Sequence, residues 1–384
     1  MRIVYCLNSI SETGGIAAAT IAKANALAEI PGNEVIVCVS DFRENALSKR
    51  LSPKVNLIDL KIAYYADDWK SKWHVIKGIV VKRKRHKRKL KDTLHSLKPD
   101  MVISVGQSEK YFLPAIKGDW KVIREVHFAS NYRVLMARGV FGKLKAKLEN
   151  FYDFKWKIKG YDRVVVLTGG DKENFWRGNR KVEVIPNPIT FTGSETATLE
   201  SKKIITIGRL EYPKNVMGLV RAFREVNKKH PDWQLEIYGE GGDKDEILKY
   251  LAEYNLKDVV LLKGVTSDPA AVLAQSAIFA LPSLFEGFGL VLIEAMECGV
   301  PVVSYDCPSG PRDIITDGED GFLVPTGDET AMAERICHLI EHTEQRKRMG
   351  AAAARKAKEY APENIAAKWM RLFADISNKR SPAP

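Results

Sequence analysis

Two glutamates, Glu286 and Glu294, stand eight positions apart in the apolar, glycine-rich stretch SLFEGFGLVLIEAMECGVPVV. A strand is expected over residues 277–283 and a helix from Gly289 to Cys298, which places Glu286 in the loop after the strand and Glu294 inside the helix. Carboxylates accept hydrogen bonds from hydroxyls, glycines let backbone N–H groups approach a ligand, and a helix N-terminus attracts an anion. The stretch therefore predicts a ligand that combines sugar hydroxyls with phosphate. The alternative is that Glu286 caps the helix and Glu294 faces solvent.

The elements around these residues alternate between strand and helix along the chain. In the first half, strands are expected at residues 1–7, 33–40, 99–106, 120–127 and 161–168. In the second half, they are expected at residues 203–210, 233–241, 259–264, 277–283 and 301–306. This alternation predicts an α/β fold with doubly wound parallel sheets, whose ligands bind at the carboxyl ends of the strands.

A chain of 384 residues is too long for one ordinary core, so two domains are expected. We predict a basic N-terminal Rossmann-like domain at residues 1–188, a linker at 189–202 and a C-terminal Rossmann-like domain at 203–358. Apolar residues at helical spacing in segment 359–384 predict a C-terminal helix that packs back on the first domain.

The net charge of +12 is concentrated in the first half of the chain. Residues 1–200 contain 36 Lys and Arg against 21 Asp and Glu, a balance of +15, and the remainder contains 24 against 27, a balance of −3. This asymmetry indicates that the first domain faces an anionic partner.

The five cysteines are odd in number and show no C-x-x-C spacing, so they are expected to be small buried residues rather than disulfide or zinc ligands. The first residues lack the apolar run of a signal peptide, and the apolar runs are too short to cross a bilayer. A cytoplasmic location is therefore expected.

The blocks IGRLEYPKN, IYGEG and FEGFGLVLIEAMECGVPVV together resemble the retaining GT-B glycosyltransferases of the family 4 type, which use nucleotide-sugar donors and carry an E-x7-E motif. Members of this family assemble capsule, lipopolysaccharide and lipid-linked glycans. The resemblance is continuous from about Lys203 to Leu323 and weaker over the first half. It implies a GT-B architecture, in which two Rossmann-like domains face each other across a cleft and a C-terminal helix crosses back to the first domain. By the same resemblance, the domain at 1–188 binds the acceptor and the domain at 203–358 binds the nucleotide sugar.

The resemblance also implies roles for individual residues of the second half. Arg209 and Lys214 match the pair that binds the donor diphosphate, where fixed positive charge stabilises the departing group. Glu294 would accept the ribose hydroxyls, and Glu286 would contact the transferred sugar. Arg209, Lys214 and Glu286 are therefore predicted catalytic residues. The other implied donor-binding residues lie in loops and at a helix start: Gly239, Gly264, Val265, Gly287, Phe288, Gly289 and Leu290.

In the first half, Gly14 and Gly15 precede a helix and match a loop that approaches the donor phosphates, although a plain tight turn is the alternative. His127, at the end of VIREVH, matches a histidine that reaches the donor sugar and is the fourth predicted catalytic residue; a structural histidine is the alternative. Family members generally need no bound metal, so no cofactor is expected. Asp243 and Asp245 in DKD are expected to open and cap a helix.

The run KGIVVKRKRHKRKLKDTLHSLKPD at residues 77–100 is the densest cluster of charge. It predicts either a solvated basic helix or attraction to an anionic membrane surface. Trp69, Trp73, Ile76 and Val80 lie nearby, and segment 143–160 repeats the mixture of lysines and aromatic residues, which favours a membrane over nucleic acid. A peripheral position at the inner face of the membrane suits a glycan or polyprenyl-diphosphate-linked acceptor.

These features predict a glycosyltransferase that moves a hexose or an N-acetylhexosamine from a nucleoside-diphosphate sugar, with UDP preferred. A GT-B-like nucleotide-sugar epimerase is the nearest alternative. An NAD-dependent oxidoreductase lacks its G-x-G-x-x-G after the first strand. A non-enzymatic membrane- or nucleic-acid-binding protein would leave the glutamate block unexplained.

Overall fold

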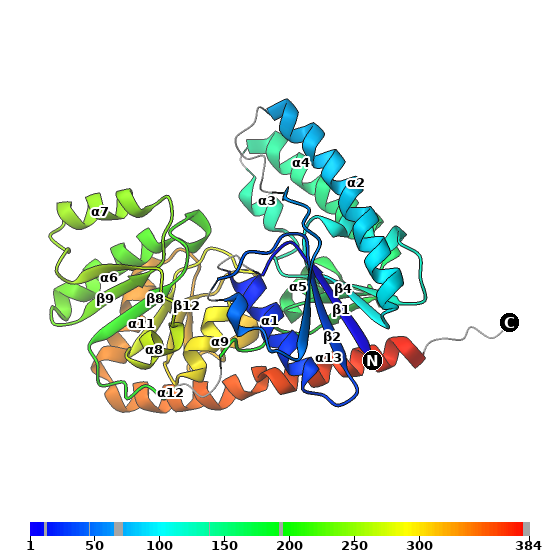
Figure 1. Cartoon of the computed structure of the whole chain (residues 1–384). Helices are drawn as coiled ribbons and strands as arrows, with labels where there is room; N and C mark the ends of the chain where they lie inside the picture. Colours follow the sequence, from blue (N-terminus) through cyan, green and yellow to red (C-terminus); the bar gives the residue numbers. More distant parts are fainter. Residues whose placement is uncertain (11–13, 46, 65–71, 138, 192–194, 379–384) are drawn as a thin grey trace. The chain divides into compact units, whose positions relative to one another are not determined.

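The computed structural model describes residues 1–10, 14–45, 47–64, 72–137, 139–191 and 195–378, apart from the side chains of residues 72–78 and 155. The chain forms two compact units (Figure 1). The first unit comprises residues 1–167 and 172–190 together with the segment that begins at Pro362, and the second comprises residues 168–171 and 191–361. The chain passes from the first unit to the second after Thr190, close to the start of the expected linker at 189–202.

The first unit is built on a parallel sheet that has seven strands in the described residues, in the order β3-β2-β1-β4-β5-β6-β7. The strands are β1 (Arg2–Leu7), β2 (Glu34–Val39), β3 (Val55–Asp59), β4 (Met101–Ser104), β5 (Lys121–Val126), β6 (Arg163–Val166) and β7 (Val182–Val184). Runs rich in Val and Ile, such as VIVCV in β2, suit strands that are buried on both faces.

Helices and short helical turns connect these strands. The α-helices are α1 (Gly15–Ala28), α2 (Lys72–Leu97), α3 (Tyr132–Met136), α4 (Gly139–Phe151), α5 (Gly169–Phe175) and the C-terminal α13 (Pro362–Asn378). The shorter turns are η1 (Ser48–Arg50), η3 (Glu109–Tyr111), η4 (Leu113–Ala115), the π-helical η5 (Tyr152–Trp156) and η6 (Lys157–Gly160).

Alternate residues of β1 enter two different core layers, as the period of a strand requires. Ile3, Tyr5 and Leu7 pack with α1 and α13, and Val4 and Cys6 pack in a second layer that includes residues of α2. α13 lies along α1 within the first unit, and its apolar face is buried there (Figure 1). The unit therefore has the α/β/α layering of a Rossmann-like domain.

The second unit repeats this plan around a parallel sheet with six strands in the described residues, in the order β10-β9-β8-β11-β12-β13. The strands are β8 (Lys203–Ile207), β9 (Gln234–Tyr238), β10 (Val260–Gly264), β11 (Ile278–Leu281), β12 (Val302–Tyr305) and β13 (Gly321–Val324). The helices are α6 (Val216–Lys229), α7 (Lys244–Glu253), α8 (Pro269–Ala274), α9 (Leu290–Glu297), α10 (Pro311–Ile314), α11 (Glu329–Glu341) and α12 (Thr343–Ala357), with the turns η7 (Tyr212–Lys214) and η8 (Lys358–Tyr360).

The expected α/β class with two Rossmann-like domains is confirmed. The ten strands expected from the sequence all form, whereas β3, β7 and β13, which lie at the edges of the two sheets, were not anticipated. The five cysteines are free and buried, as predicted. Burial raises the pKa of the thiols of Cys38 and Cys307 to about 12, so they stay protonated at neutral pH.

Candidate functional site

The strand order of the second unit explains why distant residues of the predicted donor site meet. β8 pairs with β9 on one side and with β11 on the other, so the order of the strands reverses at β8. Ligands of doubly wound sheets bind at such a switch point, outside the carboxyl ends of the strands. The loops after β8 and β11 leave the sheet at this point, and they carry Arg209, Lys214 and Glu286.

Lys214 and Glu286 form an ion pair across these two loops. Nζ of Lys214 donates a hydrogen bond to Oε1 of Glu286 over 2.6 Å. The side chain of Glu286 is 10% exposed and that of Lys214 is 25% exposed, so the pair lies at a partly buried surface. Glu286 does not cap the following helix, because Gly289 occupies the N-cap position of α9.

Arg209 lies in the same loop as Lys214 but points to the surface. Its side chain is 68% exposed, and Nη1 lies 3.0 Å from Oε2 of Glu211. An exposed guanidinium can leave such a weak surface pair for a phosphate at little cost, because exposed ion pairs contribute about 0–1 kcal/mol. Arg209 is thus available to a ligand at this edge of the sheet.

The glycines of the site bring backbone segments into close contact. Gly239 has φ of +151°, and a Cβ atom at this position would lie 1.8 Å from the carbonyl oxygen of Gly208. Gly239 also donates its backbone N–H to the oxygen of Gly264 over 2.8 Å. The loops after β8, β9 and β10 are therefore held together by their backbones, and the exposed Val265 follows directly.

The helix that follows the Glu286 loop starts in a left-handed conformation. Gly289 has φ of +91°, which favours glycine, and α9 begins at Leu290. Glu294 is buried rather than solvent-facing, at 8% exposure. Gly287 and Leu290 are half-buried, whereas the ring of Phe288 is buried and packs edge-on against Tyr360. The side chain of Phe288 therefore supports the loop by packing.

His127 follows β5 in the first unit, and its imidazole is buried beside a second charged pair. Nε2 of His127 lies 3.2 Å from Oε1 of Glu125, and the same oxygen accepts a hydrogen bond from Nζ of Lys23 on α1. Burial lowers the pKa of His127, although Glu125 partly opposes this. Burial by itself would raise the pKa of Glu125, but Lys23 and His127 together lower it to about 2. At neutral pH we therefore expect a neutral imidazole beside an ionised carboxylate.

Gly14 and Gly15 belong to the start of α1 in the first unit. Gly14 is the N-cap residue with extended backbone and no side chain to cap the helix, and both glycines are exposed. Among the described residues, which exclude 11–13, no atom lies within 4 Å of a Cβ atom placed at Gly14, at the N-terminus of α1.

Lys23 and Glu125 did not emerge as candidates from the sequence. Signals were present, because Lys23 is the one charged residue in the alanine-rich run IAAATIAKANALA, and Glu125 lies between Val122, Ile123 and Val126 in a short strand segment. A charged side chain inside a buried element needs a partner of opposite charge, and Lys23 and Glu125 are each other's partners.

No group of three or more His, Cys, Asp or Glu side chains that could hold a metal ion occurs in the described part of the chain. Asp243 occupies the N-cap position of α7, but its side chain makes no capping hydrogen bond, so the expectation that it caps this helix was wrong. Acidic residues in the first turn, including Asp245, still face the favourable end of the helix dipole. Among the described residues, no helix is long and apolar enough to cross a membrane.

Two Rossmann-like domains, one with cations and carboxylates gathered at its switch point, are the architecture of the GT-B enzymes. Residues 191–356 match the family model described as glycosyl transferases group 1. This segment, which makes up most of the second unit, is thus similar to the glycosyl transferases of group 1.

Two curated relatives match parts of the chain. An exopolysaccharide phosphotransferase of Streptomyces coelicolor is 33% identical over 224 residues, which are 57% of this chain and 24% of that protein. A Campylobacter jejuni N-acetylgalactosamine-N,N'-diacetylbacillosaminyl-diphospho-undecaprenol 4-alpha-N-acetylgalactosaminyltransferase is 35% identical over 199 residues, which are 50% of this chain and 54% of that protein. The chain therefore spans about a quarter and about half the length of these two relatives.

Among solved structures, a variant of TarM from S. aureus, in complex with fondaparinux, alpha-GlcNAc-glycerol and UDP, aligns with a TM-score of 0.77. The alignment covers 97% of this chain and 99% of TarM at 18% sequence identity. At this identity the likeness shows the fold alone, and it confirms the predicted GT-B fold class.

Proposed function

We propose that this chain is a retaining glycosyltransferase that moves a hexose or an N-acetylhexosamine from a nucleoside-diphosphate sugar, preferably a UDP-sugar, to a glycan or polyprenyl-diphosphate-linked acceptor in bacterial cell-surface glycan biosynthesis. The observation that carries the proposal is the Lys214–Glu286 pair at the carboxyl ends of the neighbouring strands β8 and β11, inside the segment that matches the family model. The name of the Campylobacter relative, with its diphospho-undecaprenol acceptor, and the UDP bound to TarM support the choice of substrates.

In the proposed reaction, the bond between the sugar's anomeric carbon and the diphosphate oxygen breaks, and a bond to the acceptor oxygen forms on the same face. The proton of the acceptor hydroxyl passes to the departing phosphate. Arg209 and Lys214 stabilise the negative charge that develops on the nucleoside diphosphate. A lysine ammonium has three donors, so Lys214 can keep its hydrogen bond to Glu286 and still donate to phosphate. In this role Glu286 holds Lys214 toward the diphosphate, and Glu294 binds the ribose. The positive charges of Arg209 and Lys214 take the place of a metal ion.

Calorimetric titration of the purified chain with UDP, GDP, ADP and NAD in the presence of EDTA tests the donor site. We expect micromolar binding of UDP and at least about tenfold weaker binding to Arg209→Ala, because hydrogen bonds to charged groups contribute about 1.5–3 kcal/mol. Arg348→Ala, which removes an exposed arginine of α12, is the matched control and should bind UDP as the wild type does. Binding of NAD alone, or unchanged affinity in Arg209→Ala, would overturn the assignment.

We also propose that the first unit lies on an anionic membrane through α4. Large apolar side chains of α4 and the turn after it are exposed, with Val140 at 82%, Phe141 at 89% and Leu148 at 63%. Lys143, Lys145 and Lys147 are exposed on the same helix, and most of the basic residues of α2 are exposed as well. Apolar side chains beside lysines suit the interface of an anionic bilayer, which attracts each basic residue by about 1 kcal/mol.

Of the aromatic and aliphatic residues expected near α2 to insert into the membrane, Val80 is exposed. Trp69 and the side chains of Trp73 and Ile76 lie outside the described residues. The membrane proposal therefore rests on α4 and on the exposed basic residues of α2.

Co-sedimentation with vesicles tests this surface. The wild type should bind vesicles that contain phosphatidylglycerol and should bind neutral vesicles at least about tenfold less, because the lysines add attraction only to anionic lipid. Phe141→Asp/Leu148→Asp should lose binding to both, since it removes the side chains that insert. Leu248→Asp alters an exposed leucine of the second unit and serves as the control. Equal binding of the double variant and the wild type would exclude α4 as the contact.

A further inference from the structure

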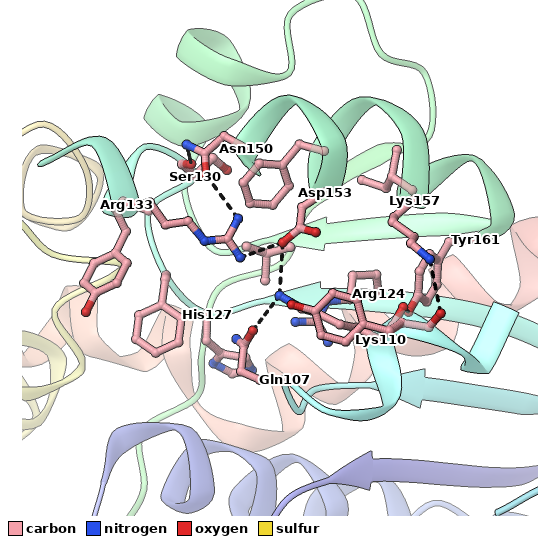
Figure 2. Close-up of a pocket in the computed structure, with 17 residues that line it drawn as sticks. Gln107, Lys110, Arg124, His127, Ser130, Arg133, Asn150, Asp153, Lys157 and Tyr161 are labelled. Atoms are coloured by element: carbon pink, nitrogen blue, oxygen red, sulfur yellow. Dashed lines mark hydrogen bonds and ion pairs between the residues drawn. The ribbon is translucent and has the colours of Figure 1, made fainter. Parts of the chain in front are cut away.

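A cavity of about 270 Å³ lies in the first unit, beside the carboxyl end of β5 (Figure 2). Its walls come from the turn η3, from the segment after β5 that begins with His127, from α3, and from the chain that runs from the end of α4 through η6. Aromatic rings, among them Phe128 and Tyr132, line part of it, and charged and polar side chains line the rest. Aromatic walls with convergent polar groups are typical of small-ligand sites.

The cavity carries an excess of positive charge. Four cationic side chains line it, whereas Asp153 is the single carboxylate among its described lining residues. Two of the cations are committed to the protein's own carbonyls: Arg124 donates to the oxygens of Ser104 and Gly106, and Lys157 donates to the oxygen of Tyr111. The remaining two, Lys110 and Arg133, determine what the cavity can bind.

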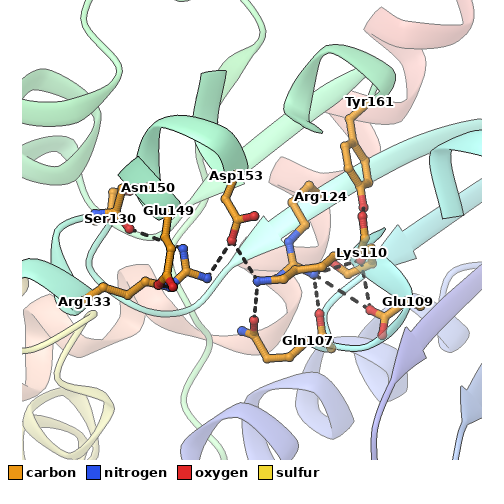
Figure 3. Close-up of polar contacts among 12 residues, drawn as sticks. Gln107, Glu109, Lys110, Arg124, Ser130, Arg133, Glu149, Asn150, Asp153 and Tyr161 are labelled. Carbon is orange, nitrogen blue, oxygen red and sulfur yellow. Dashed lines mark hydrogen bonds and ion pairs between the residues drawn. The ribbon is translucent and has the colours of Figure 1, made fainter. Parts of the chain in front are cut away.

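Lys110 and Arg133 converge on one oxygen atom. Nζ of Lys110 donates to Oδ2 of Asp153 over 3.1 Å, and Nη2 of Arg133 donates to the same oxygen over 2.6 Å (Figure 3). The side chains of Lys110, Asp153 and Arg133 are 13%, 11% and 28% exposed, so this group is shielded from solvent but reachable from the cavity. Nε of Arg133 also lies 3.9 Å from Oε2 of Glu149, but that carboxylate is 49% exposed and is not among the described lining residues of the cavity. An oxyanion that enters the cavity can therefore add charge-assisted hydrogen bonds to Lys110 and Arg133.

We propose that this cavity binds an oxyanion group, a sugar carboxylate or a phosphate, through Lys110 and Arg133, with Asp153 as the built-in carboxylate that holds the two cations in place. The aromatic walls then contact the sugar ring or other apolar part of the ligand. His127 lines the same cavity, so the bound group would lie beside a predicted catalytic residue. Identifying this ligand as part of the acceptor rests on the proposed function, whereas the oxyanion site itself does not.

Calorimetry on the full chain with glucuronate, glucose and inorganic diphosphate tests the site. Glucuronate carries a carboxylate at C6, where glucose carries a hydroxymethyl group. We therefore expect glucuronate, diphosphate or both to bind, and we expect glucose not to bind. Binding of glucuronate alone would identify an acidic sugar, and binding of diphosphate alone would identify a phosphorylated group. Because diphosphate can also occupy the donor site, each titration is repeated with Arg209→Ala, in which binding at this cavity should persist.

Three variants separate an oxyanion site from a structural ion-pair network. Arg133→Gln and, independently, Lys110→Gln should weaken oxyanion binding by about ten- to a hundredfold, since each removes a charged donor. Asp153→Asn should strengthen it by roughly tenfold, because a carboxylate that faces an anion repels it. Lys117→Gln, which changes an exposed lysine of the first unit outside the cavity, should change nothing.

Opposite effects of Asp153→Asn and Arg133→Gln would support the site. The proposal would be overturned if the wild type bound no oxyanion. It would also be overturned if Lys110→Gln and Arg133→Gln bound the oxyanion as tightly as the wild type does. UDP binding that survives Arg133→Gln while oxyanion binding is lost would show that the two sites are separate. Oxyanion binding without any nucleotide binding would refute the proposed function and leave this site standing.

Discussion

Replacing Lys23 by methionine is expected to destabilise the first unit by about 3–5 kcal/mol, the usual effect of removing one partner of a buried ion pair. The side chains of Lys23 and Glu125 are each 1% exposed. Methionine has nearly the length of lysine without its charge, so packing is largely preserved. Glu125 would then remain buried as a carboxylate without its ammonium partner, and that desolvated charge is the source of the destabilisation.

The pH dependence of stability should change sign in this variant. In the wild type, the pKa of Glu125 is lowered to about 2, so its contribution is present above its unfolded value of about 4.3 and is lost as the pH falls toward about 2. Without Lys23, burial should raise the folded pKa above the unfolded value. The variant should therefore lose stability as the pH rises above about 4.3, and its deficit should be largest at neutral pH.

Hydrogen exchange of the backbone amides of β1 and β5 measures this effect in the first unit separately from the second. The double variant Lys23→Met/Glu125→Gln should recover most of the lost free energy of unfolding, because no buried charge is left alone. Lys145→Met removes a lysine that is 79% exposed and is the control. A Lys23→Met protein within about 1 kcal/mol of the wild type at pH 7 would show that the pair contributes little.

Much of the fold follows from local sequence patterns. Short runs of Val and Ile bounded by turns identify the central strands of both sheets, because strands buried on both faces must be apolar throughout. The edge strand β7, Val182–Val184, has three residues, and its Glu183 gives it no apolar run to recognise. The edge strand β10 was nevertheless expected, because its run VVLLKG is largely apolar and ends at a glycine.

The candidate donor residues could be found because they lie in short contiguous motifs, such as GRLEYPK and the E-x7-E block, that resemble those of a known family. What the sequence does not contain is which of them touch. Lys214 and Glu286 are 72 positions apart, and they meet because β8 and β11 pair although two strands separate them in the chain. The oxyanion cavity was missed for the same reason, since Lys110 and Asp153 are 43 positions apart and neither belongs to a recognisable motif.

Replacing Glu286 or Lys214 by alanine is expected to reduce sugar transfer at least about a hundredfold in each case, the usual scale for losing a group that stabilises developing charge. Lys214→Ala removes the ammonium that faces the departing diphosphate. Glu286→Ala keeps the ammonium of Lys214 but removes the carboxylate that accepts its hydrogen bond over 2.6 Å. Release of UDP from the donor sugar, measured as kcat/KM, reports both variants, and Glu253→Ala, an exposed glutamate of α7, is the control.

The double variant distinguishes two roles for Glu286. If Glu286 acts by holding Lys214, Glu286→Ala/Lys214→Ala should be no less active than Lys214→Ala alone, because the second change removes nothing further. If Glu286 binds the transferred sugar itself, the two losses should multiply. Glu286→Gln separates the roles again, since an amide keeps hydrogen bonds to sugar hydroxyls but not the charge that holds a lysine. Turnover close to that of the wild type in either alanine variant would remove that residue from the site.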